Sequence, residues 1–301
     1  MNLRFVEAYY WVVTLQSVTR AADKLHLTQS AMSSRIAALE QELGTLLLDR
    51  RDKTQFRVTI AGQRFFRHAE RLLAWQREIR AELGGAKVAQ PVMLRLGAIE
   101  SALHSWLMDW VRQLHEAQPA LALELTVETT PVLVDQLVRG TLDLAIAALP
   151  AAGNGVRAIT LPSMPMVFVG HADLHRRRRW SLADLATVEL LTFQRGSQPH
   201  VALLDLLHRG GVEPKRVHTV SSISAMAQLV EDGLGVATLP AAVVQRLRRR
   251  MPLKALTSEA TMPPLPIHLS WRVDPGSAVQ RVVIDSLLAH LGVNPAQRKS
   301  R

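Results

Sequence analysis

The sequence predicts a protein of mixed α+β and α/β class: short helices with a β-hairpin, then one long helix, then a two-lobed α/β region. Apolar residues recur at helical spacing within short segments of residues 1–58, and one long helical pattern fills most of residues 59–88. Strand-like and helix-like segments then alternate through residues 89–301, the order typical of α/β domains. A chain of 301 residues is long enough for about two domains.

The composition limits the classes of function. The net charge of +10 favours a polyanionic partner, and residues 1–90, with 14 basic and 9 acidic residues, have a roughly doubled density of net charge. The chain contains no cysteine, which excludes disulfide scaffolds, thiolate metal sites and cysteine nucleophiles. We find no secretory signal and no apolar run of about 18 residues, so we expect a cytoplasmic protein without membrane contact.

The N-terminal segments predict short helices joined by tight turns. Ser17 begins a helix over Val18–Leu25, and only two residues separate this helix from Thr28. Thr28 is a candidate N-cap for a further helix, which Gly44 ends. Two helices joined by so short a turn predict a helix-turn-helix motif.

The helix that follows Thr28 has two contrasting faces. At 100° per residue, its apolar residues form one stripe that predicts burial: Met32, Ile36, Leu39 and Leu43. The opposite side is small and polar: Gln29, Ser30, Ser33, Ser34, Ala37 and Gln41. An ordinary solvated face is the alternative, but it would more often carry Glu and Lys. Short side chains let a helix approach a DNA groove closely, and hydroxyls and amides can bond bases and phosphates.

A short hairpin and a long helix follow. Residues 46–53 and 56–58 predict two strands with a basic tip, a wing that could touch phosphates. Thr59 caps a helix over Ile60–Leu83, which Gly84 and Gly85 end. An approximate heptad stripe runs along it through Phe65, Ala69, Leu72, Ile79 and Leu83. A plain core helix is the alternative, but a helix at a domain junction with one apolar seam favours dimerisation.

The remaining chain predicts two sets of strands and helices. The first set comprises strands at 92–99, 121–128 and 142–147, with helices at 103–116 and from Thr129 onward. The second comprises strands at 165–170, 190–193, 217–220 and 236–239, with helices at 197–209 and 223–232. A late strand at 266–272 and a helix at 277–291 close the chain. This order predicts parallel sheets covered by helices, with a cleft at the carboxyl ends of the strands.

Polar residues that follow these strands are candidate contacts for a small ligand. They are Ser101, Thr129, Thr130, Arg195, Gly196, Ser197 and Ser222, with Ser221 beside the last. A plain N-cap role is the alternative for each Ser or Thr. As a set they favour a small anionic effector such as a carboxylate, because helix N-termini attract anions and Arg195 could add a charge-assisted hydrogen bond.

Several motifs resemble the signature of LysR-type transcriptional regulators. They are the run from Ser17 to Ser33, Ile36-x-x-Leu39-Glu40-x-x-Leu43-Gly44, Leu48-x-Arg50 and Val58-Thr59-x-Ala61-Gly62. Asp143 to Ile146 and Asp232 to Pro240 match landmarks of the family's ligand-binding region. Ser30 stands where the family most often has proline, Leu48 replaces a common phenylalanine, and the wing is about one residue longer.

The resemblance implies a division of the chain. Residues 1–58 would form a winged helix-turn-helix that binds DNA, 59–88 a linker helix that dimerises, and 89–301 an effector-binding domain. That domain would resemble periplasmic binding proteins, with one lobe of about 91–161 and 268–293 and another of about 162–267. The DNA contacts it implies include the major-groove face and several backbone contacts: Arg20, Thr28, Gln29, Ser30, Ser33, Ser34, Arg35, Arg50, Arg51 and Lys53. Lys24 also fits backbone positioning, unless it is simply a solvated residue of its helix.

The function that the resemblance implies is operator binding modulated by a small effector. Its partners would be double-stranded DNA, the effector, a second copy through the linker helix, a tetramer built from two dimers, and RNA polymerase as a further candidate. We expect no enzyme activity, no cofactor and no metal. One alternative is an architectural or replication-inhibiting DNA-binding protein without a dedicated effector. Another is an enzyme or solute-binding protein on the same lobes, although the sequence holds no Walker loop, His-Glu-x-x-His or Gly-x-Ser-x-Gly motif.

Overall fold

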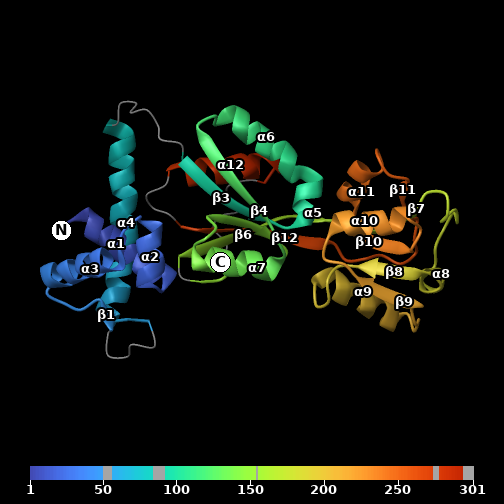
Figure 1. Cartoon of the computed structure of the whole chain (residues 1–301), viewed down its shortest axis with the longest axis horizontal. Coiled ribbons are helices and arrows are strands. Elements are labelled where there is room, and N and C mark those ends of the chain that lie inside the picture. Colours follow the sequence, from blue (N-terminus) through green and yellow to red (C-terminus); the bar gives the residue numbers. More distant parts are fainter. Residues whose placement is uncertain (50–55, 84–91, 154, 274–277, 294–301) are drawn as a thin grey trace.

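The computed structural model describes residues 1–49, 56–83, 92–153, 155–273 and 278–293. Figure 1 shows three bodies side by side along the long axis: an N-terminal helical unit, a first α/β lobe in the centre and a second lobe beyond it. The N-terminal unit comprises α1 (Leu3–Leu15), α2 (Val18–Lys24), α3 (Gln29–Leu43), β1 (Leu48–Asp49), β2 (Arg57–Val58) and α4 (Ile60–Leu83). This agrees with the helices and the hairpin that the sequence predicts.

Local capping chemistry sets the ends of these helices. The side chains of Ser17 and Thr28 accept hydrogen bonds from backbone N–H groups in the first turns of α2 and α3. Gly44 ends α3 in the left-handed conformation, at φ +65°. The hydroxyl of Thr59 accepts from the backbone N–H of Gly62 at 2.9 Å and so caps α4.

The core of this unit surrounds α1, in which Ala8 to Leu15 are all buried. Tyr9 contacts Phe65 of α4 edge to face at 5.4 Å, and Tyr10 stacks on Phe66 at 5.2 Å. The first half of α4 therefore belongs to the N-terminal core. The predicted heptad seam is wrong over this half, because Phe65 and the fully buried Ala69 pack within their own chain. Farther along α4, Trp75 and Ile79 are 54% and 55% exposed.

The first lobe has a five-stranded sheet in the order β4-β3-β5-β12-β6. Its strands are β3 (Val92–Ala98), β4 (Leu121–Val127), β5 (Leu144–Ala147), β6 (Val156–Met164) and β12 (Leu265–Arg272). Its helices are α5 (Glu100–Ala102), a π-helical turn (Leu103–Leu107), α6 (Met108–Ala117), α7 (Thr130–Arg139) and α12 (Ala278–His290). Figure 1 shows α6 and α12 on one face of the sheet and α7 on the other.

The second lobe has a sheet in the order β11-β7-β10-β8-β9. Its strands are β7 (Met166–His171), β8 (Glu189–Thr192), β9 (Arg216–Thr219), β10 (Val236–Pro240) and β11 (Leu253–Ala255). Its helices are α8 (Leu182–Ala186), α9 (Gln198–Arg209), α10 (Ile223–Glu231) and α11 (Ala241–Leu247).

The sheets differ from the prediction of parallel strands, because each is mixed. β12 returns from the second lobe and pairs antiparallel with β5 and β6, and β7 pairs antiparallel with β10. The sequence analysis did not predict β6, whose residues are mostly exposed or half-buried at the sheet edge and therefore show no clear apolar alternation. The helix predicted from Leu103 already begins at Glu100.

Polar contacts join the N-terminal unit to the first lobe. The ammonium of Lys24 lies 3.2 Å from a carboxylate oxygen of Asp143, so it is neither a solvated residue nor a free DNA contact. The guanidinium of Arg272, 3% exposed, donates to the carbonyl oxygens of Thr14 and Leu137 at 2.9 Å each. Burial lowers the pKa of Arg272 to about 10, and the nearby charge of Arg20 acts in the same direction.

We predict that Gly62→Ala destabilises the N-terminal unit. A methyl group at this position would overlap the carbonyl oxygen of Leu47, which cannot move without disturbing β1. We expect a loss of about 2 kcal/mol in the free energy of unfolding, measured by urea denaturation. Gly153→Ala is the matched control, because its nearest contact would be an ordinary 3.6 Å. Equal stability of the two variants would contradict this account.

Candidate functional site

The outer face of α3 is a polar surface open to solvent. Gln29, Ser30, Ser33 and Ser34 are exposed, and Arg35 is half-buried beside them. The buried side of the same helix carries Met32, Ile36 and Leu39, as the helical spacing predicts. Thr28 is exposed, and its hydroxyl lies 3.0 Å from that of Ser30 at the start of the helix. The structure thus brings together the short polar side chains that were predicted to contact DNA.

A buried carboxylate connects α3 to the wing. Glu40 is 6% exposed and accepts hydrogen bonds from the backbone N–H groups of Leu47 and Leu48, at 2.8 and 3.0 Å. The start of β1 is therefore held at a set position relative to α3. Sequence reasoning missed this role, because a glutamate near the end of a helix is usually a solvated residue.

The other predicted DNA contacts divide into two groups. Arg20 is half-buried on α2. Burial is the larger cause of the lowered pKa of Arg272, and the charge of Arg20 adds to it. Arg20 therefore lies toward the first lobe. Arg50, Arg51 and Lys53 lie outside the described residues.

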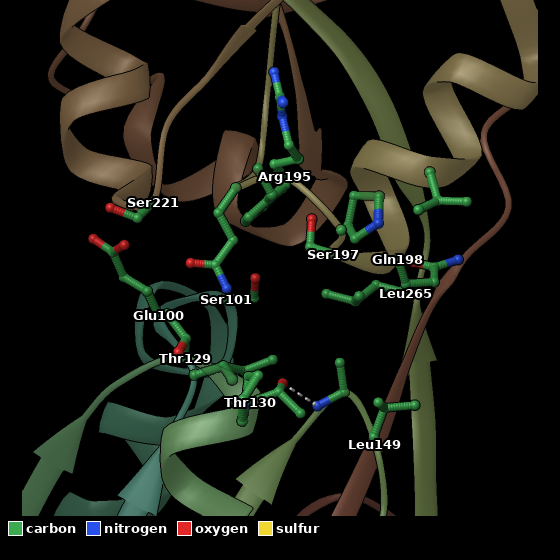
Figure 2. Close-up of a pocket in the computed structure, with 18 of the residues that line it drawn as sticks. Glu100, Ser101, Thr129, Thr130, Leu149, Arg195, Ser197, Gln198, Ser221 and Leu265 are labelled. Carbon is green, nitrogen blue, oxygen red and sulfur yellow. Dashed lines mark hydrogen bonds between the residues drawn. The ribbon is translucent and has the colours of Figure 1, made fainter.

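A cleft of about 950 Å³ lies between the two lobes. Every residue predicted to bind an effector lines it: Ser101, Thr129, Thr130, Arg195, Gly196, Ser197 and Ser222. Figure 2 shows Ser101, Thr129 and Thr130 of the first lobe facing Ser197 and Ser221 of the second. The residues meet because both lobes present the carboxyl ends of their strands to the cleft.

Three of the predicted hydroxyls are already used within the chain. The hydroxyl of Thr130 accepts from the backbone N–H of Ala148 at 3.1 Å. Those of Ser197 and Ser222 accept from backbone N–H groups at the starts of α9 and α10, at 3.4 and 3.3 Å. The bonds of Ser197 and Ser222 are the N-cap roles that were the alternative for these residues, whereas the bond of Thr130 joins the start of α7 to the residue after β5. Among the described residues, Ser101 is 2% exposed and its hydroxyl has no hydrogen-bond partner.

Arg195 differs from the prediction. Figure 2 shows its guanidinium pointing away from the space between the lobes. The side chain is exposed, and Gly196 turns the backbone at φ +82° directly after it. The guanidinium is open to solvent in this position and does not point into the cleft.

The sequence analysis missed the most extensively bonded side chain of the cleft, Glu100. Its carboxylate crosses from the first lobe to the start of α10 and accepts hydrogen bonds from the backbone N–H groups of Ile223 and Ser224, at 2.6 and 3.3 Å. The hydroxyls of Ser222 and Ser224 donate to it at 3.1 and 3.3 Å. His104, one helical turn farther on, lies 3.3 Å away. No spacing in the sequence could indicate this contact, because 122 or more residues separate its partners.

The hydrogen bonds around Glu100 change its acidity. Partial burial alone would raise the pKa of this carboxyl, but donors from His104, Ile223, Ser224 and Ser222 outweigh burial and lower the pKa to about 2. The side chain is therefore a carboxylate at neutral pH, although it lies between two packed lobes.

Neither a metal cluster nor a membrane-spanning helix is found within the described part of the chain. No three His, Asp or Glu residues there group as metal ligands. No helix there is both long and apolar enough to cross a bilayer.

Comparison with known proteins matches both parts of the chain. Residues 3–63 match the family described as bacterial regulatory helix-turn-helix protein, lysR family, and residues 92–292 match the LysR substrate binding domain. A probable hydrogen peroxide-inducible genes activator of Mycobacterium avium is 30% identical over 275 residues, which is 90% of this chain and 88% of the relative. The regulator BenM of Acinetobacter baylyi is 26% identical, over 80% of this chain and 81% of its own.

Solved structures show the same fold. A full-length variant of OxyR from Pseudomonas aeruginosa superposes with a TM-score of 0.63 at 24% identity, covering 100% of this chain and 99% of its own. CbnR in complex with its target DNA superposes with a TM-score of 0.53 at 22% identity, over 97% of this chain and 99% of the other.

We predict that the Glu100 contact stabilises the protein only while its carboxyl is ionised. Because its pKa is lowered from 4.5 to about 2 in the folded chain, the stabilisation is complete above pH 4.5 and is lost as the pH falls toward about 2. The difference in free energy of unfolding between wild type and Glu100→Gln should therefore shrink below pH 4.5. Urea denaturation at pH 7, 5, 4 and 3 measures it; a difference that does not vary with pH would refute the assignment.

Proposed function

Because the chain belongs to the LysR family of bacterial transcriptional regulators, we propose that it binds operator DNA through α3 and that a small effector in the cleft modulates this binding. The observation that carries the proposal is the exposed face of α3, where Gln29, Ser30, Ser33 and Ser34 are open to solvent. Short hydroxyl and amide side chains allow a helix to lie close to base edges in the major groove. Arg35 and the wing would add phosphate contacts. Because operator DNA of bacteria lies in the cytoplasm, we propose that the protein acts there.

The cleft supports an effector-responsive regulator over the architectural alternative. A volume of about 950 Å³ is at the upper end of what small-molecule sites occupy, roughly 300–1,000 Å³. Side chains from both lobes line it, so a bound ligand would contact both and would change their relative position.

The signal is not sensed by a thiol in this chain. Several relatives are named as hydrogen peroxide-inducible genes activators. The present sequence contains no cysteine, so thiolate oxidation cannot transmit a peroxide signal here. We therefore propose reversible binding of a small molecule as the input.

The exposed end of α4 supports assembly of two copies. Trp75 and Ile79 lie one helical turn apart and leave more than half of their surfaces open, and adjacent exposed apolar side chains mark interaction surfaces. A dimer through this helix would present two copies of α3 to two half-sites of an operator, and a tetramer and a contact with RNA polymerase are further proposals of the same kind.

The proposal is tested by selecting genomic DNA fragments with the purified full-length protein. We expect enrichment of a few fragments that carry paired half-sites, bound at least about 10³-fold more tightly than random DNA. Uniform recovery of all fragments would instead support the architectural alternative.

We predict that Ser33→Asp and Ser34→Asp each weaken binding to a selected fragment by about tenfold or more, which is about 1.4 kcal/mol. A new carboxylate on the outer face of α3 would repel phosphates and could not donate to base acceptors. Fluorescence anisotropy measures the affinity. Ala120→Asp, an exposed position on the first lobe, makes the same charge change far from α3 and should leave affinity unchanged. The proposed orientation fails if all three variants bind alike.

We predict that Ile79→Glu separates the dimer without unfolding the chain. Ile79 is 55% exposed in one protomer, so a glutamate there is solvated in the monomer but would be buried in the dimer. Sedimentation velocity should show a shift toward monomer, with an unchanged circular dichroism spectrum. Val282→Glu replaces an apolar residue that is 46% exposed on α12 and serves as the matched control. If Ile79→Glu dimerises over the same concentration range as wild type, the dimer interface lies elsewhere.

A further inference from the structure

The described lining of the cleft is acidic on balance. It contains three carboxylates, those of Glu100, Glu128 and Asp205, and one basic side chain, Arg195. Asp205 also forms an ion pair with Arg209 on the same helix, at 2.8 Å. Figure 2 shows that the guanidinium of Arg195 is directed away from the cleft. A ligand between the lobes therefore meets negative charge and no inward-facing cation among these residues.

One of the helix starts where a ligand carboxylate could bind is already filled. α10 is nine residues long, and the backbone N–H groups at its start make the local potential positive. The carboxylate of Glu100 lies on those N–H groups, 2.6 Å from the nitrogen of Ile223 and 3.3 Å from that of Ser224. The Ser222 hydroxyl donates to the same carboxylate at 3.1 Å, so a helix start that could hold an anionic ligand holds a side chain from the opposite lobe.

The rest of the cleft offers apolar surface and an unused hydroxyl. Val127 and Leu149 of the first lobe and Val201 of the second line the cleft and are 37%, 58% and 54% exposed. Large apolar side chains exposed together in a concave site indicate an apolar ligand surface. Within the described chain, the hydroxyl of Ser101 is unpartnered at 2% exposure and faces the cleft, where it can donate to or accept from a neutral polar group.

We propose that Glu100 is a specificity-determining residue of the cleft: it occupies the start of α10 in place of a ligand carboxylate and selects an effector with an apolar body and an uncharged or basic polar group. This inference rests on the proposed function only in that it takes the cleft to hold an effector. It replaces the anionic effector that the sequence predicts, because two of the features on which that prediction depended have changed: Arg195 is turned away, and one of the helix starts, that of α10, is occupied.

The same contact holds the lobes together without a ligand. Glu100 follows β3 of the first lobe, whereas all of its backbone donors belong to the second. The groups that face the carboxylate are His104 on its own helical segment and Ser222, Ile223 and Ser224 at the start of α10. An effector with a basic group would be attracted to Glu100, while an acidic one would be repelled by it.

The test compares butyrate with butyramide, which share size and an apolar chain and differ in charge. We measure the thermal unfolding temperature of full-length wild type, Glu100→Ala and Glu128→Ala with each compound at equal ionic strength and pH 7. In Glu100→Ala the start of α10 is empty, so butyrate should raise the unfolding temperature by several degrees more than butyramide does. In wild type, butyrate should give no larger rise than butyramide.

Glu128→Ala is the matched control, because it removes another carboxylate from the same cleft. The Glu128 carboxylate accepts a hydrogen bond from the backbone N–H of Thr129 at 3.4 Å, within its own lobe. This variant removes negative charge without emptying a helix start, so its gain of preference for butyrate should be clearly smaller than that of Glu100→Ala. A preference for butyrate in wild type, or no gain of preference in Glu100→Ala, would overturn the proposal. These unfolding temperatures are measured without DNA. If no operator fragment is selected, the proposed DNA-binding function fails but the result for Glu100 is unaffected.

A second comparison decides the point if Glu100→Ala does not fold. Ser224→Asp adds a negative charge in the first turn of α10, a position where acidic residues usually stabilise a helix. Beside the Glu100 carboxylate it should instead lower the unfolding temperature by several degrees, whereas in a Glu100→Gln background it should raise it. Ala183→Asp, on an exposed residue in the first turn of α8 at the far end of the second lobe (Figure 1), is the control and should show no such reversal. Shifts of the same sign in both backgrounds would contradict the proposal.

Discussion

The burial of α1 is the constraint on which the N-terminal unit depends. Ala8 to Leu15 are buried without interruption, so α3 and α4 must each turn an apolar stripe toward this helix. Each large side chain removed from water in this way contributes roughly 1.5–3 kcal/mol, more than any single surface contact. Since the apolar stripe of α3 packs on α1, the polar face of α3 has only solvent or a partner to contact. The orientation of the candidate DNA-binding surface thus follows from packing.

Polar contacts also join the three bodies, in addition to an apolar cluster that the two lobes share. Lys24 with Asp143 and Arg272 with two backbone carbonyls connect the N-terminal unit to the first lobe, and Glu100 connects the first lobe to the second. Desolvation offsets much of the energy of such contacts, so their main effect is to select one arrangement among several.

The two junctions meet on one strand. Arg95 of β3 binds Asp143, with a guanidinium nitrogen 3.0 Å from the carboxylate, and Asp143 in turn binds Lys24 of the N-terminal unit. The same strand ends at Ala98, two residues before Glu100. A displacement of β3 would therefore change the contact with the second lobe and the contact with the N-terminal unit together. This gives a physical connection between the cleft and the unit that carries α3.

The sequence by itself determined the features that depend on neighbouring residues. Capping residues mark the starts of α2, α3 and α4, Gly44 marks the end of α3, and helical spacing separates the buried Met32, Ile36 and Leu39 from the exposed serines. The cleft-lining set was also predictable, because parallel strands bring their carboxyl ends to one edge. Only the tertiary structure decided what those residues can bind. Glu100 meets its partners on α10 across 122 or more residues, and no neighbouring residue in the sequence signals the direction of the Arg195 side chain. Charge complementarity between distant segments leaves no periodic signal in a sequence, so the electrostatic character of the cleft became visible only when the lobes were placed together.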